Sequence, residues 1–243
     1  MDTKQTPAEP AEPAAEPGRL RARPEAKPAA AGGPTGVSRL NLGDHRRDGL
    51  LYVPAGYRPD RPAPFALMLH GAGGNAHHGL DLLRAPADAA GLILLAPESR
   101  GRTWDLILGG YGPDVEFIDR ALAHTFARYA VDPARLAAGG FSDGASYALS
   151  LGITNGDRFT HVIAFSPGFA APAAAHGMPR VFVSHGTRDG VLPIDACSRR
   201  VVPHLRRAGY DVLYREFQGA HTIPDAVRAE AMEWFLPEKD RGA

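Results

Sequence analysis

The sequence predicts an α/β protein in which helices cover both faces of a mostly parallel sheet. Short apolar segments alternate with longer amphipathic ones along most of the 243 residues. Several short segments are apolar on both faces, as buried parallel strands are. Elements that alternate in this way form βαβ units. Such sheets bind their ligands at the carboxyl ends of the strands, so the loops that follow the strands are the expected location of any chemistry.

Each expected element follows from its hydrophobic period. The expected strands are residues 50–53, 65–69, 92–96, 136–138, 162–165, 181–184 and 212–217. The expected helices are residues 81–90, 114–130, 143–152, 195–208 and 223–235. The clearest helix is 114–130, because Val115, Ile118 and Leu122 recur at three- and four-residue spacing. Pro113 precedes it and Pro133 follows it, as is common at helix boundaries.

Residues 1–34 differ in composition from the rest of the chain. They contain seven prolines and nine alanines, and their only larger aliphatic or thioether side chains are Met1 and Leu20. Such a segment buries too little apolar surface to offset its conformational entropy. We therefore expect a disordered tail over 1–34, followed by one domain at 35–243 that is long enough for a single core.

Composition excludes several classes of function. The 27 basic and 27 acidic residues leave no basic excess to attract nucleic acid. Cys197 is the single cysteine, so an intrachain disulfide and a multi-cysteine zinc site are both excluded. The sequence has neither the roughly 20 consecutive apolar residues of a membrane span nor the apolar core of a secretory signal. A cytoplasmic protein without stable membrane insertion is expected, while the oligomeric state stays open.

The sequence Gly140-Phe141-Ser142-Asp143-Gly144 matches the pattern GxSxG. An expected strand runs into it and an expected helix follows it, which is the context that a nucleophile elbow requires. This turn would expose the Ser142 hydroxyl and place the backbone N–H of Asp143 at the positive end of a helix, where it could bind an oxyanion. The alternative is a glycine-rich connection in which the serine caps the helix.

A nucleophilic serine needs a histidine base, and that histidine needs a carboxylate to orient it. In this type of fold the chain order is serine, acid, histidine. Asp189 lies in the loop after strand 181–184 and is the candidate acid. Asp195 is the competitor, but it precedes an expected helix and fits an N-cap better.

Two histidines follow Asp189, and only one lies in a loop. His221 comes after strand 212–217 and Gly219, where a base can reach across the sheet edge. His204 falls inside an amphipathic helix pattern. His221 is therefore the candidate base, with an ordinary surface histidine as the alternative interpretation.

A second oxyanion donor is expected after strand 65–69, which runs into His70-Gly71-Ala72-Gly73-Gly74. Loops so rich in glycine can present backbone N–H groups to a substrate. We assign the donor to Ala72, with Gly73 as a near alternative and substrate contact. A phosphate-binding loop is the competing interpretation, but the Gly-Lys-Ser/Thr ending is missing.

Apolar side chains between strand 92–96 and the helix after Pro113 are candidates for a substrate pocket. They are Trp104, Ile107 and Tyr111, together with their neighbours Leu106 and Leu108. The functional interpretation is that these side chains form the apolar wall of a substrate pocket. An equally supported alternative is a loop packed onto the sheet as core.

At this point the sequence resembles the α/β-hydrolase superfamily, and within it the phospholipase/carboxylesterase group with its dienelactone-hydrolase-like esterases. The matching motifs are LHGAGGNA at 69–76, GGFSDGAS at 139–146, SHGTRDGVLP at 184–193 and GAH at 219–221. Their spacing extends the resemblance over most of residues 48–236 but not over the tail. The resemblance implies hydrolysis of carboxylic esters or thioesters through an acyl-serine intermediate, with Ser142, Asp189 and His221 as the triad and no metal or organic cofactor.

Two departures from that group bear on the substrate. Dienelactone hydrolases use a cysteine nucleophile, whereas the elbow here carries serine. The short segment 166–180 leaves no room for the large cap of lipases, so an open site for small esters with short or medium acyl groups is expected. Two alternatives remain: an amide or peptide hydrolase with the same triad, and a non-catalytic binding scaffold.

Overall fold

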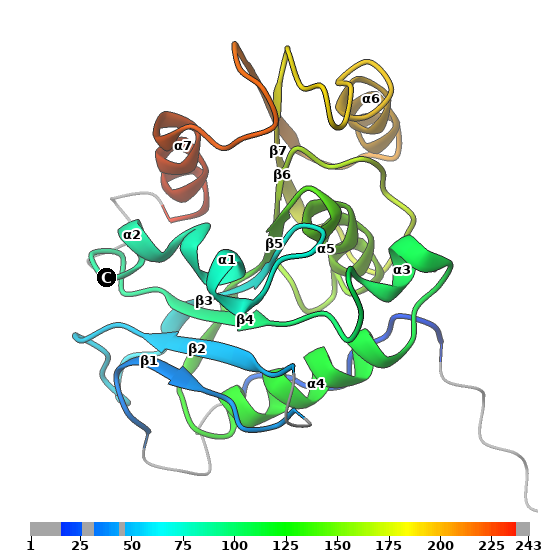
Figure 1. The fold of residues 1–243 in the computed structure, drawn as a ribbon. Coiled ribbons are helices and arrows are strands. Elements are labelled where there is room, and N and C mark those ends of the chain that lie inside the picture. The colour runs from blue at the N-terminus through cyan, green and yellow to red at the C-terminus, as the bar shows by residue number, and fades with distance from the viewer. Residues whose placement is uncertain (1–15, 26–31, 44–46, 237–243) are drawn as a thin grey trace, which may run out of the picture.

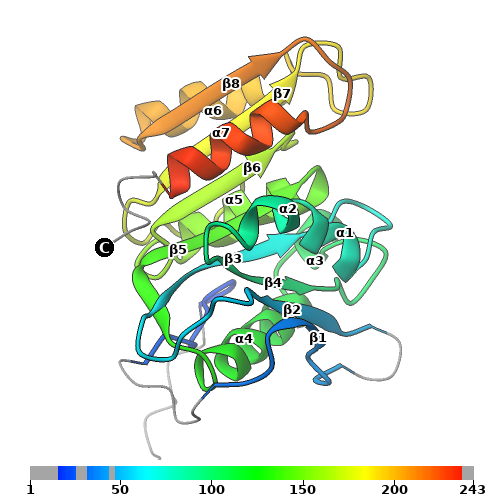
Figure 2. The ribbon, with the colours of Figure 1, turned by 90° about the vertical axis from the view of Figure 1, so that its left-hand side faces the viewer.

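One eight-stranded sheet forms the centre of the protein in the computed structural model, which describes residues 16–25, 32–43 and 47–236 (Figures 1 and 2). The strands are β1 (Gly36–Arg39), β2 (Gly49–Val53), β3 (Ala63–Leu69), β4 (Ile93–Pro97), β5 (Val131–Phe141), β6 (His161–Phe165), β7 (Arg180–Gly186) and β8 (Val212–Phe217). Their order is β1-β2-β4-β3-β5-β6-β7-β8. In this order every pairing from β4 to β8 is parallel. At one edge, β1 pairs antiparallel with β2, and β2 pairs antiparallel with β4.

Helices cover both faces of the sheet, which confirms the fold class predicted from the sequence (Figure 2). One face packs against α1 (Ala76–Asp81), α2 (Arg84–Ala87) and α7 (Asp225–Phe235). The other face packs against α4 (Pro113–Phe126), α5 (Asp143–Thr154) and α6 (Ser198–Arg207), with the short α3 (Asp105–Leu108) before α4. Residues 166–179, which join β6 to β7, contain no helix and form no cap. None of the described helices has the length and apolar character needed to cross a membrane.

The differences from the predicted elements have local causes. β1 was not predicted because its side chains alternate between exposed and half-buried, as at a sheet edge, instead of forming an apolar run. The single helix expected over 81–90 does not form: α1 already ends at Asp81, and the short α2 (Arg84–Ala87) contains Pro86. Helix α6, expected over 195–208, starts at Ser198 with Cys197 as its N-cap. The N-cap predicted at Asp195 is therefore wrong, and that carboxylate instead contacts Arg199 at 2.9 Å.

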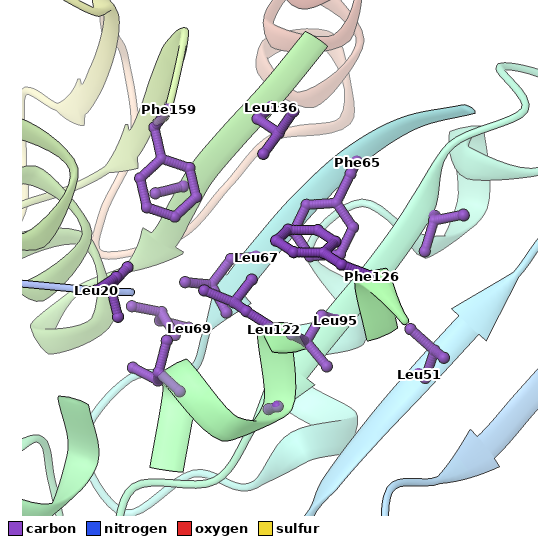
Figure 3. Packing of buried hydrophobic residues seen from close by; sticks show 14 of the residues in the cluster. Leu20, Leu51, Phe65, Leu67, Leu69, Leu95, Leu122, Phe126, Leu136 and Phe159 are labelled. Carbon is purple, nitrogen blue, oxygen red and sulfur yellow. The ribbon is translucent and has the colours of Figure 1, made fainter. Parts of the chain in front are cut away.

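Part of the segment expected to be a disordered tail is instead packed against the domain (Figure 1, dark blue, beside α4). Leu20 is 1% exposed and belongs to the core cluster that contains Leu69 and Phe159 (Figure 3). Pro34 also makes contact, because its carbonyl oxygen accepts a 3.0 Å hydrogen bond from Tyr129. Disorder over the whole of 1–34 is therefore wrong for residues 16–25 and 32–34. Residues 1–15 and 26–31 of that segment, and residues 44–46 and 237–243 of the expected domain, lie outside the described residues.

Side-chain clamps explain why a segment with one large aliphatic residue can pack. Asn155, fully buried at the end of α5, donates to the Gly18 carbonyl at 2.8 Å and accepts from the Leu20 N–H at 2.9 Å. Asp119 of α4 accepts the next two backbone N–H groups at 2.7 and 2.8 Å. Arg19 forms a two-point contact with Asp157 at 2.8 and 3.0 Å. Composition underestimated this segment because its partners are distant polar side chains rather than apolar surface.

We predict that Leu20→Ala lowers the free energy of unfolding by about 3 kcal/mol, because it empties a buried site. Urea unfolding followed by circular dichroism measures the change. Arg21→Ala is the matched control, since that neighbouring side chain is exposed, and it should change stability by less than about 0.5 kcal/mol. Equal stability of the two variants would mean that the segment is not held in solution.

His161 is a buried titratable side chain far along the sheet from the glycine-rich loops. Its ring lies edge-on to Trp234 and Phe235 of α7, with both pairs of ring centroids 5.0 Å apart. Burial, with a smaller contribution from the Arg180 charge, lowers the pKa of His161 to about 4. The folded state therefore holds the neutral ring at pH values where the unfolded chain already binds a proton.

This shift predicts that acid destabilises the protein through His161. The neutral His161 ring contributes fully to the free energy of unfolding above its unfolded pKa near 6.5. That contribution is lost progressively as the pH falls toward about 4. Between pH 7.5 and 4.5 the wild type should lose about 2 kcal/mol more stability than His161→Phe, as measured by urea unfolding at each pH. An equal loss in both proteins would contradict the assignment.

Candidate active site

The turn between β5 and α5 holds Ser142 in a strained conformation. Its backbone has φ 58° and ψ −121°, in a region that non-glycine residues rarely adopt. Glycine is required on both sides by close packing: a Cβ on Gly140 would lie 2.4 Å from the Gly144 backbone, and one on Gly144 would lie 2.2 Å from the Leu69 carbonyl oxygen. Ser142 makes no side-chain capping hydrogen bond to α5, so the alternative of a helix-capping serine does not describe it.

The three residues predicted as a triad come together at the carboxyl ends of β5, β7 and β8. Ser142 Oγ lies 2.9 Å from His221 Nε2, and His221 Nδ1 lies 2.6 Å from Asp189 Oδ2. Because the carboxylate only accepts, Nδ1 carries the proton and Nε2 is free to accept from the serine hydroxyl. The His221 ring also rests on Phe141, with ring centroids 4.6 Å apart. This arrangement can transfer a proton from the serine to the histidine.

Asp189 is buried yet well supplied with hydrogen-bond donors. Its Oδ1 accepts from the backbone N–H groups of Val191 at 2.9 Å and Leu192 at 2.8 Å. Burial by itself would raise the pKa of the Asp189 carboxyl, but the hydrogen bonds from His221, Leu192 and Val191 outweigh it and hold that pKa below its ordinary value. The group is therefore ionised at neutral pH and can stabilise a protonated His221.

The glycine-rich loop after β3 lies against the elbow. A Cβ on Gly71 would be 3.4 Å from the Ser142 Cβ. The N–H of Gly73 donates to the Arg102 carbonyl at 2.7 Å, so the predicted alternative donor at Gly73 is wrong in this structure. Among the described residues, no acceptor is bonded to the N–H of Ala72. The N–H of Ala72 therefore remains a candidate oxyanion donor of this loop.

The other predicted oxyanion donor is the first residue of α5. The N–H of Asp143 has no acceptor within the helix, as is general for the first turn. The Asp143 carboxylate accepts a 2.6 Å hydrogen bond from Thr103, which keeps it turned toward the segment before α3. Thr103 was not among the predicted site residues, because no local pattern reveals a partner 40 positions away.

The predicted pocket residues pack mainly into the core. Trp104 is fully buried, donates from Nε1 to the His70 carbonyl at 2.8 Å and stacks between His70 and Tyr147. A substrate cannot reach a side chain without exposed surface, so the pocket role predicted for Trp104 is wrong and the core alternative holds. Its side chain packs against the start of the glycine-rich loop that follows β3.

Ile107 and Tyr111 are half-buried and pack against the same core cluster. The Tyr111 ring contacts Tyr147 and approaches Gly18 of the N-terminal segment, and its hydroxyl lies 3.5 Å from Thr154 at the far end of α5. These contacts place Tyr111 away from the elbow, so its substrate role is not supported. Ile107 remains a candidate for the pocket wall.

A row of hydroxyls on α5 fastens the segment after β6 to the helix. Three buried side chains, spaced four residues apart, each accept a backbone N–H from that segment at 2.9 to 3.2 Å. The pairs are Gly168 with Ser146, Ala171 with Ser150 and Ala173 with Thr154. The segment beside the elbow is thereby fixed without a cap.

No three His, Cys, Asp or Glu side chains within the described ranges gather as metal ligands would.

Comparisons with known proteins agree with this geometry. Residues 115–236 match the phospholipase/carboxylesterase family model. Feruloyl esterase C of Emericella nidulans is 30% identical over 172 residues, which are 66% of this chain and 60% of that protein. The chain thus spans about 60% of the length of the curated relatives that match it first.

Solved structures share the fold at lower identity. Esterase 2 of Thermogutta terrifontis, phosphorylated by paraoxon, has a TM-score of 0.65 at 19% identity and covers 93% of this chain and all of its own. The fluorophosphonate-binding serine hydrolase F of Staphylococcus aureus has a TM-score of 0.67 at 14% identity, over 85% of this chain and all of its own. These likenesses show an α/β-hydrolase fold. With its family match over half the sequence, the chain belongs to the phospholipase/carboxylesterase family.

Proposed function

We propose that the protein is a serine hydrolase that cleaves carboxylic esters or thioesters through an acyl-serine intermediate. The observation that carries the proposal is the position of His221, whose two ring nitrogens lie 2.9 Å from Ser142 Oγ and 2.6 Å from Asp189 Oδ2. A histidine held in this way activates the hydroxyl of a serine that a strained turn holds beside it. Family membership supports the same reaction class.

In the proposed mechanism, His221 Nε2 takes the hydroxyl proton as Ser142 Oγ attacks the carbonyl carbon. The negative oxygen of the tetrahedral intermediate receives hydrogen bonds from the N–H groups of Ala72 and Asp143. Protonated His221 then gives its proton to the leaving alcohol, which departs and leaves an acyl-serine. Water repeats the sequence, again with His221 as base, and releases the acid and the free serine.

The substrates we propose are small esters with short or medium acyl groups. The support is the absence of a helix from residues 166–179, which are all described, and the exposed Val191 beside the acid. A site without a cap offers too little enclosed apolar surface to hold a long acyl chain. The name of the relative feruloyl esterase C adds feruloyl esters to the substrates worth testing.

We predict that the wild type hydrolyses p-nitrophenyl acetate and p-nitrophenyl butyrate faster than p-nitrophenyl octanoate. We also predict that Ser142→Ala lowers kcat/KM by more than about a thousandfold, because the nucleophile is removed. Initial rates at each ester concentration, with methyl ferulate added as an aryl acyl substrate, measure both effects. Ser38→Ala is the matched control and should retain wild-type rates, because Ser38 lies in β1, the edge strand at the other side of the sheet from β8.

Other outcomes would favour the remaining functions. Faster turnover of a matched anilide than of its ester would indicate an amide or peptide hydrolase with the same residues. Equal background rates in the wild type and in folded Ser142→Ala, on esters and anilides alike, would contradict catalysis and favour a binding scaffold.

A further inference from the structure

A second histidine contacts the acid of the proposed triad. His185, near the end of β7, is fully buried, and its Nε2 lies 3.2 Å from Asp189 Oδ2 and 2.8 Å from the Leu192 carbonyl oxygen. Its other nitrogen, Nδ1, lies 2.6 Å from Ser198 Oγ at the start of α6. His221 contacts the same oxygen of Asp189, so one carboxylate oxygen faces two imidazoles.

These partners fix the protonation of the His185 ring. The Leu192 carbonyl and the Asp189 carboxylate can only accept, so Nε2 must carry a hydrogen. Burial lowers the pKa of His185, which keeps the ring neutral and leaves Nδ1 as an acceptor. The Ser198 hydroxyl then donates to Nδ1 and holds the ring in this tautomer.

The contacts form a chain of hydrogen bonds from Ser198 to the loop that carries Asp189. His185 donates from Nε2 to the Leu192 carbonyl, and Leu192 donates its N–H to Asp189 Oδ1. Rotation of the carboxylate away from His221 would break the bond from Leu192 and the 3.2 Å contact of Oδ2 with His185. Other titratable groups near this pair are Glu216 of β8 and Cys197 before α6.

We infer that His185, held by Ser198, is a positioning residue for this reaction: its Nε2–H holds the Leu192 carbonyl and lies beside Asp189 Oδ2, so that Oδ2 meets His221 Nδ1. The inference rests on the proposed function of the triad. It differs from a purely structural role for a buried histidine, which would affect stability but not the alignment of Asp189 with His221.

Two substitutions separate the nitrogens of His185. Glutamine places its amide nitrogen near the position of Nε2 and can still donate to the Leu192 carbonyl beside Asp189, whereas asparagine reaches only the position of Nδ1 and Ser198. We expect His185→Gln to keep kcat within about threefold of wild type, and His185→Asn to lower kcat by about tenfold or more with KM within twofold. Ser198→Ala keeps the Nε2–H donor and should fall between them.

The basic strength of His221 gives a second readout that a structural role would not move. Loss of the His185 donor leaves the charge of Asp189 concentrated on His221, so the acidic limb of kcat/KM should shift to higher pH in His185→Asn but not in His185→Gln. Thermal unfolding of each variant shows how much of any effect is a loss of folded protein.

Losses that follow the melting temperatures of the variants, with kcat per folded molecule and the pH profile unchanged, would overturn the inference. Failure of the proposed function is distinguishable, because it would appear in the wild type as no difference from Ser142→Ala. In that case an NMR titration of the His221 ring still decides the positioning role. A higher His221 pKa in His185→Asn than in wild type supports it, and an unchanged pKa contradicts it.

Discussion

The close approach of the elbow to β3 is the constraint on which the rest of the site depends. Gly144 lies so near the carbonyl oxygen of Leu69 that no side chain fits between them, and this contact brings the start of α5 against the loop after β3. Next to this contact, Ser142 has a positive φ of 58°. The elbow and the glycine-rich loop after β3 therefore lie together at the carboxyl ends of the central strands, where the proposed oxyanion donors and the Ser142 hydroxyl belong.

Burial and hydrogen bonding then divide the titratable groups by role. Asp189 stays ionised in a buried position because backbone amides and a histidine compensate its loss of hydration. His185 and His161 are buried and kept neutral, one beside that carboxylate and the other against the aromatic side chains of α7. His221 is the partly exposed ring of the three, which suits the proton transfers proposed for it.

Sequence reasoning succeeded where a pattern carries its own geometry. The GxSxG turn, the parallel strands and the loop positions of Asp189 and His221 follow from local periods and glycine placement, and the structure brings these residues together. It failed where the partner is distant in the chain. Leu20 is buried because Asn155 binds its backbone and Asp119 binds the two residues that follow it. Trp104 belongs to the core because His70 and Tyr147 enclose it. No single-sequence pattern encodes such tertiary contacts.

The most direct test of the account is covalent labelling with a fluorophosphonate, followed by intact-mass measurement and peptide mapping. If Ser142 is the nucleophile, one phosphonyl group is added to it and folded Ser142→Ala takes no label. His221→Gln is labelled much more slowly, because the base is lost. A protein that folds but takes no label, or that is labelled on another residue, would contradict the claim that the elbow, His221 and Asp189 together make Ser142 a nucleophile.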